Sequence, residues 1–376
     1  MKKLVIGLTS PGSVPLIKGQ AKYFVEKGYE VYLMCPEEER SIKYCKDEGC
    51  KLLPVPIERY ISPLSDIKSL ILITKVLNEI KPDIVNVGTP KMGFLGMIGA
   101  WFNKVPKRIY TCRGLRYEHE KGLFKKFLRF IEKIPGILSH YIICISPSVE
   151  HKALKEKVFN PKKTIVISKG SSNGLDLSKF SIDKVDESER NKLIKKYSAD
   201  SNFIYTFVGR IIDRKGINEL YEAFDAINKK YRDTRLIFVG NFDKKQLRDV
   251  DIIRKLKNHD NIHLAGWQDN VPLFFSISDV FVMPAWWEGF GNSYIEAAAM
   301  GVPIIGTNGT GCIDAVNDGF NGIIVNVKSI EELKKAMNVY YENKEILIEH
   351  GENGIRWAKN FENEIIWNGL QKLYEK

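Results

Sequence analysis

The stretch DVFVMPAWWEGFGNSYIEAAAM, residues 279–300, contains the features that decide the fold. Residues 279–285 are an apolar run typical of a buried strand, residues 286–291 predict a loop, and residues 293–300 predict a helix that stops before Pro303. A buried strand that leads through a loop into a helix is the building unit of a parallel α/β sheet. Because such sheets bind ligands at the carboxyl ends of their strands, we expect a site around residues 286–296.

Two carboxylates flank this turn, Glu288 on the loop and Glu296 in the first turn of the helix. Carboxylates accept hydrogen bonds from sugar or ribose hydroxyls, and the free N–H groups of a helix start favour phosphate. For Glu296 an alternative exists, because Ser293 to Glu296 matches the S-x-x-E capping box. Glu288 has no such structural explanation, so it is the stronger candidate for ligand binding.

Composition indicates a soluble globular enzyme-sized protein. The chain has 376 residues, of which 44% are hydrophobic and 27% charged, and this length predicts two domains. Its six cysteines are scattered without a C-x-x-C pair, as expected of reduced core thiols in a cytoplasmic protein. The loop at residues 9–15 lacks G-x-G-x-x-G, which argues against a dinucleotide cofactor.

Strand and helix patterns alternate twice along the chain, first over residues 1 to about 170 and again from residue 203. Each series predicts a parallel sheet covered by helices. We therefore expect an α/β protein of two Rossmann-like domains, residues 1–178 and 179–376, that face each other across a cleft. The last helix, predicted over residues 346–374, is expected to cross back to the N-terminal domain.

Charge is concentrated in the N-terminal half. The net charge is +11, and residues 1–178 hold 30 basic against 17 acidic residues. Such a surface indicates an anionic partner. Within it, Lys121–Leu138 interleaves basic and aromatic residues, which is typical of an amphipathic helix at an anionic membrane surface. An ordinary packed helix with a solvated lysine face fits the pattern equally well.

Two cations are predicted at a strand-to-helix junction. Arg210 follows the strand at residues 203–208, and Lys215 precedes the next helix, so both converge with free backbone N–H groups where a diphosphate fits. The glycine-rich loop Asn308–Cys312 offers further N–H groups for a second phosphate or a sugar. Asp249 and Asp251 form a D-x-D, which we interpret as a solvated helix face because no neighbouring carboxylate completes a metal set.

Taken together, these motifs resemble retaining glycosyltransferases of family 4. Gly209-Arg210, Lys215-Gly216, Asn173-Gly174-Leu175-Asp176, Glu288 to Glu296 and Thr310-Gly311 match in order over essentially the whole chain. The overall sequence pattern is most similar to that of bacterial capsule and O-antigen transferases, which add an N-acetylhexosamine to a lipid-linked sugar. The resemblance implies a GT-B fold, with a nucleotide-sugar donor held by the C-terminal domain and an acceptor held by the N-terminal one.

The resemblance also implies roles for individual residues. Catalysis is expected from Glu288, Arg210 and Lys215. Donor contacts are expected from Arg210, Lys215, Phe290, Gly291, Asn292, Glu296, Asn173 and Thr310, and acceptor contacts from Gly12, Ser13 and Arg113. One departure concerns the histidine that many members have after the strand here at residues 110–112. This chain has Arg113-Gly114 there and His119 farther on, so either Arg113 or His119 is left for that position.

The expected reaction is transfer of a sugar, with retained configuration, from a UDP-sugar to a saccharide on undecaprenyl diphosphate. It needs neither a cofactor nor a metal, and it takes place on the inner face of the plasma membrane. Two alternatives stay open from the sequence. A nucleotide-sugar epimerase shares the two-domain fold, and a nucleic-acid-binding protein has the basic charge but not the expected reading helix or aromatic pair.

Overall fold

The computed structural model describes residues 1–58 and 60–376, and it divides into two compact units. Residues 1–174 and 363–376 form the N-terminal unit, and residues 175–362 form the C-terminal unit. The division falls four residues before the position expected from the sequence, and the last helix belongs to the N-terminal unit.

The N-terminal unit is built on a seven-stranded parallel sheet in the order β3-β2-β1-β4-β5-β6-β7. Successive side chains of a strand point to opposite faces, so a strand buried on both faces is apolar throughout. In β1, Val5 lies in one core while Leu4 and Ile6 lie in the other. The strands are β1 (Lys3–Gly7), β2 (Glu30–Cys35), β3 (Lys51–Pro54), β4 (Ile84–Gly88), β5 (Lys107–Cys112), β6 (Tyr141–Cys144) and β7 (Thr164–Ile165).

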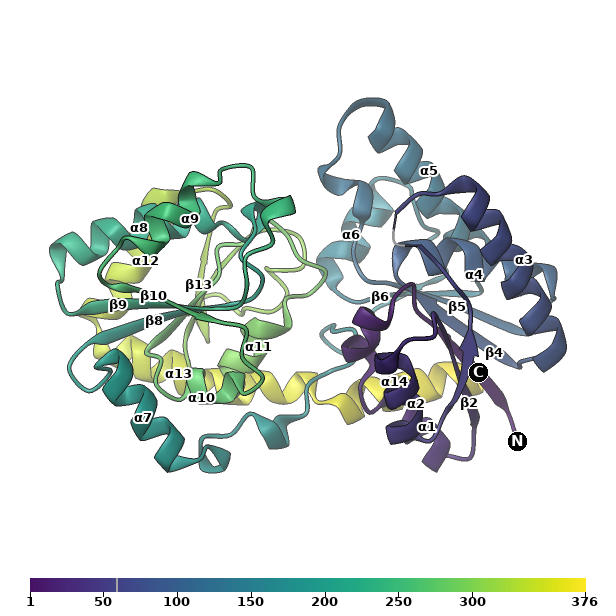
Figure 1. Ribbon diagram of the computed structural model, residues 1–376, viewed down its shortest axis with the longest axis horizontal. Helices are drawn as coiled ribbons and strands as arrows, with labels where there is room; N and C mark the ends of the chain where they lie inside the picture. Colours follow the sequence, from purple (N-terminus) through teal and green to yellow (C-terminus); the bar gives the residue numbers. More distant parts are fainter. Residues whose placement is uncertain (59) are drawn as a thin grey trace. The chain divides into compact units, whose positions relative to one another are not determined.

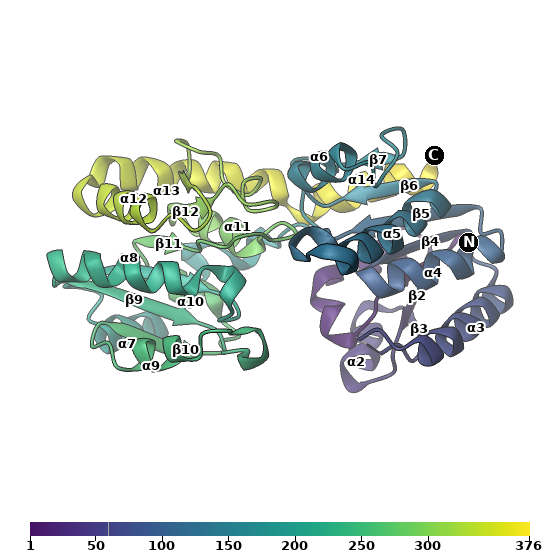
Figure 2. The same cartoon turned by 90° about the horizontal axis from the view of Figure 1, so that it is seen from above.

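Helices cover both faces of this sheet (Figures 1 and 2). One core joins the sheet to α3 (Pro63–Ile80), α4 (Pro90–Phe102), α5 (Gly122–Leu138) and α6 (Pro147–Lys155). The other joins it to α1 (Gln20–Glu26), α2 (Glu39–Glu48) and α14 (Asn363–Glu375). Leu370, Leu373 and Tyr374 bury α14 in this second core, so the C-terminal helix is an integral part of the N-terminal unit.

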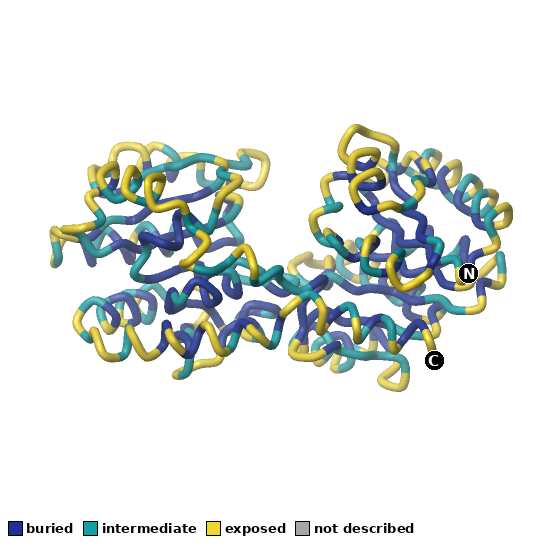
Figure 3. Tube along the Cα trace, turned by 90° about the horizontal axis from the view of Figure 1, so that it is seen from below, coloured by how far each residue is buried: buried dark blue, intermediate teal, exposed yellow. Residues whose placement is uncertain are grey.

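The C-terminal unit repeats the design with a six-stranded parallel sheet in the order β10-β9-β8-β11-β12-β13. Its strands are β8 (Phe203–Val208), β9 (Thr234–Val239), β10 (Ile262–Gly266), β11 (Val280–Val282), β12 (Ile304–Thr307) and β13 (Gly322–Val325). Its helices are α7 (Glu187–Tyr197), α8 (Ile217–Lys230), α9 (Asp251–Lys257), α10 (Val271–Phe275), α11 (Asn292–Ala299), α12 (Ile330–Glu342) and α13 (Lys344–Ala358). Figure 3 shows buried segments running through each unit, and in the central strands β4 and β11 every residue is buried.

Strand order reverses at one place in each sheet. In the C-terminal unit β8 and β11 are hydrogen-bonded neighbours although two strands separate them in sequence. In the N-terminal unit the same holds for β1 and β4. Ligands of open α/β sheets bind at such reversals, beyond the carboxyl ends of the strands. The loops after β8 and β11 carry Arg210, Lys215 and Glu288, so the sheet topology brings the sequence motifs to one edge.

Three smaller observations complete the fold. The single helix predicted over residues 346–374 is wrong: α13 ends at Ala358 and α14 begins at Asn363, because Glu362 has an extended backbone (φ −58°, ψ 142°). All six cysteines are free thiols, and five of them are buried. Among residues 1–58 and 60–376, none of the helices has both the length and the apolar character that crossing a bilayer requires.

Candidate functional site

The first wall of the site is the loop between β8 and α8. Arg210 lies two residues beyond the strand, with its side chain 46% exposed and Nη1 3.3 Å from Oδ2 of Asp243. A 3-10 turn, Asp213–Lys215, then leads into α8 through Gly216. Gly216 has φ 71°, and a Cβ there would lie 2.1 Å from the carbonyl oxygen of Pro284. Only glycine fits this approach, so the turn that aims Lys215 is held against the end of β11.

Glu288 and two cations form a largely buried cluster between the two loops, with Lys215 buried and Arg214 and Glu288 partly exposed. Nζ of Lys215 lies 2.8 Å from Oε1 of Glu288, and Nη1 of Arg214 lies 2.9 Å from the same oxygen. Burial raises the pKa of Glu288, but the positive charges of Lys215 and Arg214 outweigh it and hold that pKa below 4.5. The carboxylate is therefore ionised at neutral pH, and the cluster carries a surplus of positive charge.

A third loop supports Glu288 from behind. The N–H of Glu288 donates to the carbonyl of Thr310 (2.9 Å). A Cβ on Gly309 would lie 2.3 Å from the carbonyl of Trp286, and one on Gly311 would lie 2.2 Å from the carbonyl of Glu288. The glycines of residues 308–312 thus let two backbones pack in direct contact, and this contact fixes the position of the Glu288 loop.

Glu296 lies on α11, and its capping-box explanation is wrong. The helix begins at Asn292 after Gly291 (φ 77°), so Ser293 is inside the helix and its hydroxyl faces Sδ of Met283 at 3.6 Å. Burial raises the pKa of Glu296 to about 7, and the charge of Lys215 acts in the opposite direction. The two carboxyls of the motif therefore have pKa values shifted in opposite directions, a pattern found where acid and base roles differ.

The residues between the carboxyls shape the start of α11. Phe290 is buried and packs against Phe361, with ring centroids 5.2 Å apart. Gly291 has a left-handed backbone (φ 77°), and a Cβ there would lie 2.7 Å from the ring of Tyr294, so this position requires glycine. Asn292 is the first helical residue. Backbone N–H groups at this helix start point beyond the carboxyl edge of the sheet, where an anion is favoured.

Sequence reasoning missed two residues. Arg214 shares Glu288 with Lys215, yet only its place beside Lys215 hinted at this role. Thr89 lies at the strand reversal of the N-terminal unit, with φ 74° and its Oγ1 2.6 Å from Oγ1 of Thr9. A β-branched residue in this conformation is strained. The positive φ cannot be read from sequence, although the G-T-P tripeptide after a strand marks the turn.

Asn173, an expected donor contact, lies in the N-terminal unit with both ends of its amide engaged. Nδ2 donates to the carbonyl of Lys18 (2.7 Å), and Oδ1 accepts from the indole N–H of Trp367 (2.8 Å). Asn173 therefore links the loop after β7 to α14 through hydrogen bonds. Its contact with the donor stays a prediction.

The expected acceptor residues Gly12 and Ser13 lie on a 3-10 turn, Pro11–Ile17, directly after β1. Gly12 is exposed and Ser13 half-buried, and the N–H of Gly12 donates to Oγ of Ser10 (3.2 Å). The turn stands at the carboxyl edge of the N-terminal sheet, beside the reversal between β1 and β4. Their role in acceptor binding stays a prediction.

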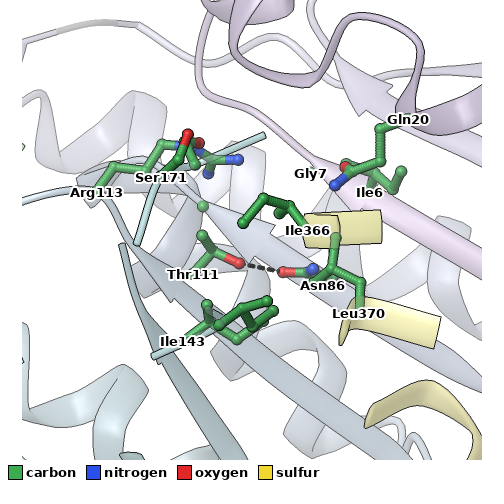
Figure 4. A pocket seen from close by; sticks show the side chains of 13 residues that line it. Ile6, Gly7, Gln20, Asn86, Thr111, Arg113, Ile143, Ser171, Ile366 and Leu370 are labelled. Carbon is green, nitrogen blue, oxygen red and sulfur yellow. Dashed lines mark hydrogen bonds between the residues drawn. The ribbon is translucent and has the colours of Figure 1, made fainter. Parts of the chain in front are cut away.

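Arg113 extends into the interior of the N-terminal unit (Figure 4). Its Nε donates to Oγ of Ser172 (2.7 Å), while Nη1 is buried and has no hydrogen-bond partner among the described residues. Gly88 makes room, since a Cβ there would lie 1.5 Å from Nη1. Burial lowers the pKa of Arg113 to about 10. The adjoining cavity, about 10 Å³, is the size of one water molecule, so a phosphate would need the side chain to move.

The other candidate for the missing histidine position, His119, ends the 3-10 turn Arg116–His119, with Nε2 3.7 Å from Oε2 of Glu118.

Across residues 1–58 and 60–376 no cluster of three or more His, Cys, Asp or Glu side chains is arranged to hold a metal ion. Asp249 and Asp251 are used locally, as the N–H of Asp251 donates to Asp249 (3.0 Å) and Arg254 pairs with Asp251 (2.9 Å).

Comparison with known proteins identifies two matching family profiles. Residues 189–357 match the profile described as glycosyl transferases group 1, and residues 6–146 match the profile described as glycosyl transferase 4-like. The two matches fall in the C-terminal and N-terminal units, respectively.

Several curated relatives are similar over nearly their whole length. A capsular polysaccharide biosynthesis glycosyltransferase, CapM, of Staphylococcus aureus is 35% identical over 98% of this chain and 95% of its own. An Escherichia coli UDP-Gal:α-D-GlcNAc-diphosphoundecaprenol α-1,3-galactosyltransferase is 29% identical over 91% and 85%. A Campylobacter jejuni N,N′-diacetylbacillosaminyl-diphospho-undecaprenol α-1,3-N-acetylgalactosaminyltransferase is 24% identical over 96% and 94%.

The fold has a solved counterpart in Anabaena HepE, crystallised in complex with UDP-glucose. It aligns over all of both chains with a TM-score of 0.81 and 17% identity. At this identity the likeness supports the fold alone. The predicted α/β GT-B architecture of two Rossmann-like units is confirmed.

Proposed function

This chain belongs to the group 1 glycosyltransferases, and from that premise we propose that it moves an N-acetylhexosamine from a UDP-sugar to a lipid-linked saccharide. Because the chain belongs to this family, we propose a glycosyltransferase and reject the two alternatives left open by the sequence, an epimerase and a nucleic-acid-binding protein. The UDP donor and the undecaprenyl-diphosphate acceptor are supported by the Escherichia coli relative, whose own name contains both. N-acetylhexosamine is supported by the Campylobacter relative.

One observation carries the proposal: Arg214 and Lys215 converge on Glu288 at the β8–β11 reversal, and Arg210 lies on the same loop, 3.3 Å from Asp243. Three basic side chains against two acidic ones, Glu288 and Asp243, leave a positive surplus at the end of a parallel sheet, where a diphosphate fits. We assign the ribose hydroxyls to Glu296, which is half-buried on α11. Thr310 and the N–H groups around Gly291 complete the proposed donor contacts.

The proposed reaction proceeds on one face of the sugar with retained anomeric configuration. The C1–oxygen bond to the diphosphate breaks, the diphosphate leaves with the electron pair, and the acceptor hydroxyl oxygen bonds to C1 from the same side. The hydroxyl proton passes to the leaving oxygen, so no strong base is required. Arg210 and Lys215 stabilise the charge that grows on the diphosphate, and Glu288 orients the sugar hydroxyls.

Association with an anionic membrane surface is proposed through α5. Lys121 and Lys126 are exposed, as are Leu123, Phe124 and Phe130. An interfacial helix needs this combination of basic and aromatic side chains in solvent. Arg129 contributes less, because its guanidinium donates to the carbonyl of Glu156. We place the protein at the inner face of the plasma membrane, where the nucleotide sugar is available.

The function is tested by incubating the purified chain with UDP-GlcNAc, UDP-GalNAc or UDP-Gal and a saccharide on polyprenyl diphosphate. We expect UDP release that depends on the acceptor, with an N-acetylhexosamine preferred and the α anomer in the product by NMR. Conversion of the donor to its epimer without acceptor would contradict the proposal. Preference for UDP-Gal would contradict only the choice of sugar.

The proposed membrane association is tested separately with vesicles that contain anionic lipid. The double variant Lys121→Gln/Lys126→Gln should bind them about thirtyfold more weakly, since each basic residue near such a surface contributes about 1 kcal/mol. The matched control is Lys335→Gln/Lys344→Gln, which removes the same charge from exposed helix positions in the C-terminal unit. Equal binding by both double variants would contradict a role for α5.

A further inference from the structure

An apolar groove lies in the N-terminal unit, and Pro90 and Lys91, which follow the strand reversal at Thr89, form one end of its lining. It is about 350 Å³ in volume and is lined by side chains of three helices. Helix α4 packs against α3 on one side and α5 on the other. Ile67 and Leu70 of α3, Phe94 and Ile98 of α4, and Phe127 and Ile131 of α5 line it. The volume is within the range of small-molecule sites.

The surface around the groove is unusually apolar. On α3, Leu64, Ile67 and Ile71 are 79%, 57% and 65% exposed, a stripe at helical spacing that faces solvent. On the other side of the groove, α5 exposes Leu123, Phe124, Phe127 and Phe130. Contiguous apolar surface of this kind marks an interaction site. The stripe on α3 means that the surface extends beyond the amphipathic helix recognised in the sequence.

The groove lining holds two basic and two acidic side chains, Lys91, Arg116, Asp66 and Glu132. Asp66 and Lys91, both in the lining, neutralise each other through a contact of 2.6 Å. Glu132, also in the lining, is buried and accepts a hydrogen bond from the hydroxyl of Tyr110. Arg116, in the lining, is exposed, whereas Glu132 is buried and engaged by Tyr110, and α5 carries Lys125 and Lys126 outside the lining. An anionic head group attached to an apolar chain complements this combination.

We propose that the groove binds the isoprenoid chain of the lipid-linked acceptor, with its diphosphate toward Arg116. This inference rests on the proposed function for the identity of the lipid, and it adds a binding site that the donor chemistry does not use. The chain's first isoprene units lie inside the groove, between Phe94, Ile98 and Ile131. The groove therefore selects acceptors by their lipid as well as by their sugar.

The probe is geranylgeranyl diphosphate, used below its micellar concentration and compared with inorganic diphosphate. Wild-type protein should bind the isoprenyl compound at least about tenfold more tightly, because burial of about two methylene groups already gives that factor. Ile67→Asp, on the groove wall, and Ile98→Trp, which fills the groove, should each lose about tenfold in affinity for the isoprenyl compound.

The matched control is Ile71→Asp, which makes the same change one helical turn from Ile67 at a position outside the lining. Its affinity for geranylgeranyl diphosphate should stay within about twofold of wild type. If Ile67→Asp and Ile71→Asp weaken binding equally, the chain adsorbs to the surface and the groove is not its site. Equal binding of the two diphosphates by wild type also overturns the inference.

Transfer assays separate this inference from the proposed function. Acceptors with the same saccharide diphosphate on a C20 isoprenyl chain and on an ethyl group should differ in KM by about tenfold or more in wild type, and by less in Ile98→Trp. Equal KM values with active transfer overturn the groove and leave the function standing. Tight, groove-dependent binding of geranylgeranyl diphosphate with no transfer to any lipid acceptor overturns the function and leaves the groove standing.

Discussion

Replacing Lys215 by methionine tests the donor site most sharply, because the substitution removes the ammonium and keeps an unbranched apolar side chain. Lys215 is buried, and its Nζ lies 2.8 Å from Glu288 at the point where we place the diphosphate. A hydrogen bond from a charged donor is worth about 1.5–3 kcal/mol. The Kd for UDP should therefore rise by roughly tenfold to 150-fold in Lys215→Met.

The change also acts on the protein itself. Glu288 keeps Arg214 at 2.9 Å but loses its other cation, so the pKa of Glu288 rises toward its ordinary value. We expect a lower melting temperature without ligand, since removal of one partner from a buried pair destabilises the fold. Affinity must therefore be measured at a temperature where thermal unfolding shows the variant to be folded.

Isothermal titration calorimetry with UDP and with uridine separates the two effects. Uridine has no phosphate, so its weaker binding should be similar in wild type and Lys215→Met. The exposed control Lys335→Met, on α12, should bind both ligands as wild type does. A Kd for UDP within about twofold of wild type in Lys215→Met refutes the assignment, and an equal loss for uridine indicates a collapsed pocket.

Other consequences of the structure are open to measurement. Arg210→Ala should slow turnover by roughly tenfold to a hundredfold, because it removes one charged hydrogen bond to the leaving diphosphate; unchanged kcat argues against this role. Activity should survive excess EDTA, whereas a loss that magnesium restores would show that a metal assists. Burial raises the pKa of Glu132 to about 7 from 4.5, so its contribution to stability is complete below pH 4.5 and is lost as the pH rises through 7. In wild type the unfolding free energy should therefore fall between pH 5 and pH 8, and in Glu132→Gln this fall should be smaller by up to about 3 kcal/mol. Chemical denaturation at several pH values measures it. Parallel plots of unfolding free energy against pH for the two proteins would contradict the burial argument.

Much of the fold was predictable because both sheets are parallel and buried. β8, which is buried along almost its whole length, has the bounds expected from its sequence, residues 203–208. β3 was missed because it is short and lies at the sheet edge, with exposed Lys51 and Pro54. The break between α13 and α14 was missed because apolar spacing continues through it, while the change of direction depends on the backbone of Glu362.

The sequence predicted which residues form the site but not which of them form ion pairs with one another. Strand-to-helix junctions pointed to Arg210, Lys215 and Glu288, since parallel topology gathers such junctions at one edge. That Arg214 and Lys215 share one oxygen of Glu288 depends on contacts across more than 70 residues, which local pattern does not contain. The capping-box alternative for Glu296 failed because Gly291, in a left-handed conformation, starts the helix before Ser293.

A crystal structure of the chain with a UDP-sugar tests the central claim most directly. We predict electron density for the diphosphate at the β8–β11 reversal, with its oxygens in hydrogen-bond contact with Arg210 and Lys215 and the ribose beside Glu296. Density for the nucleotide at any other place, with the Lys215–Glu288 pair intact and no phosphate in contact with either cation, would contradict the account.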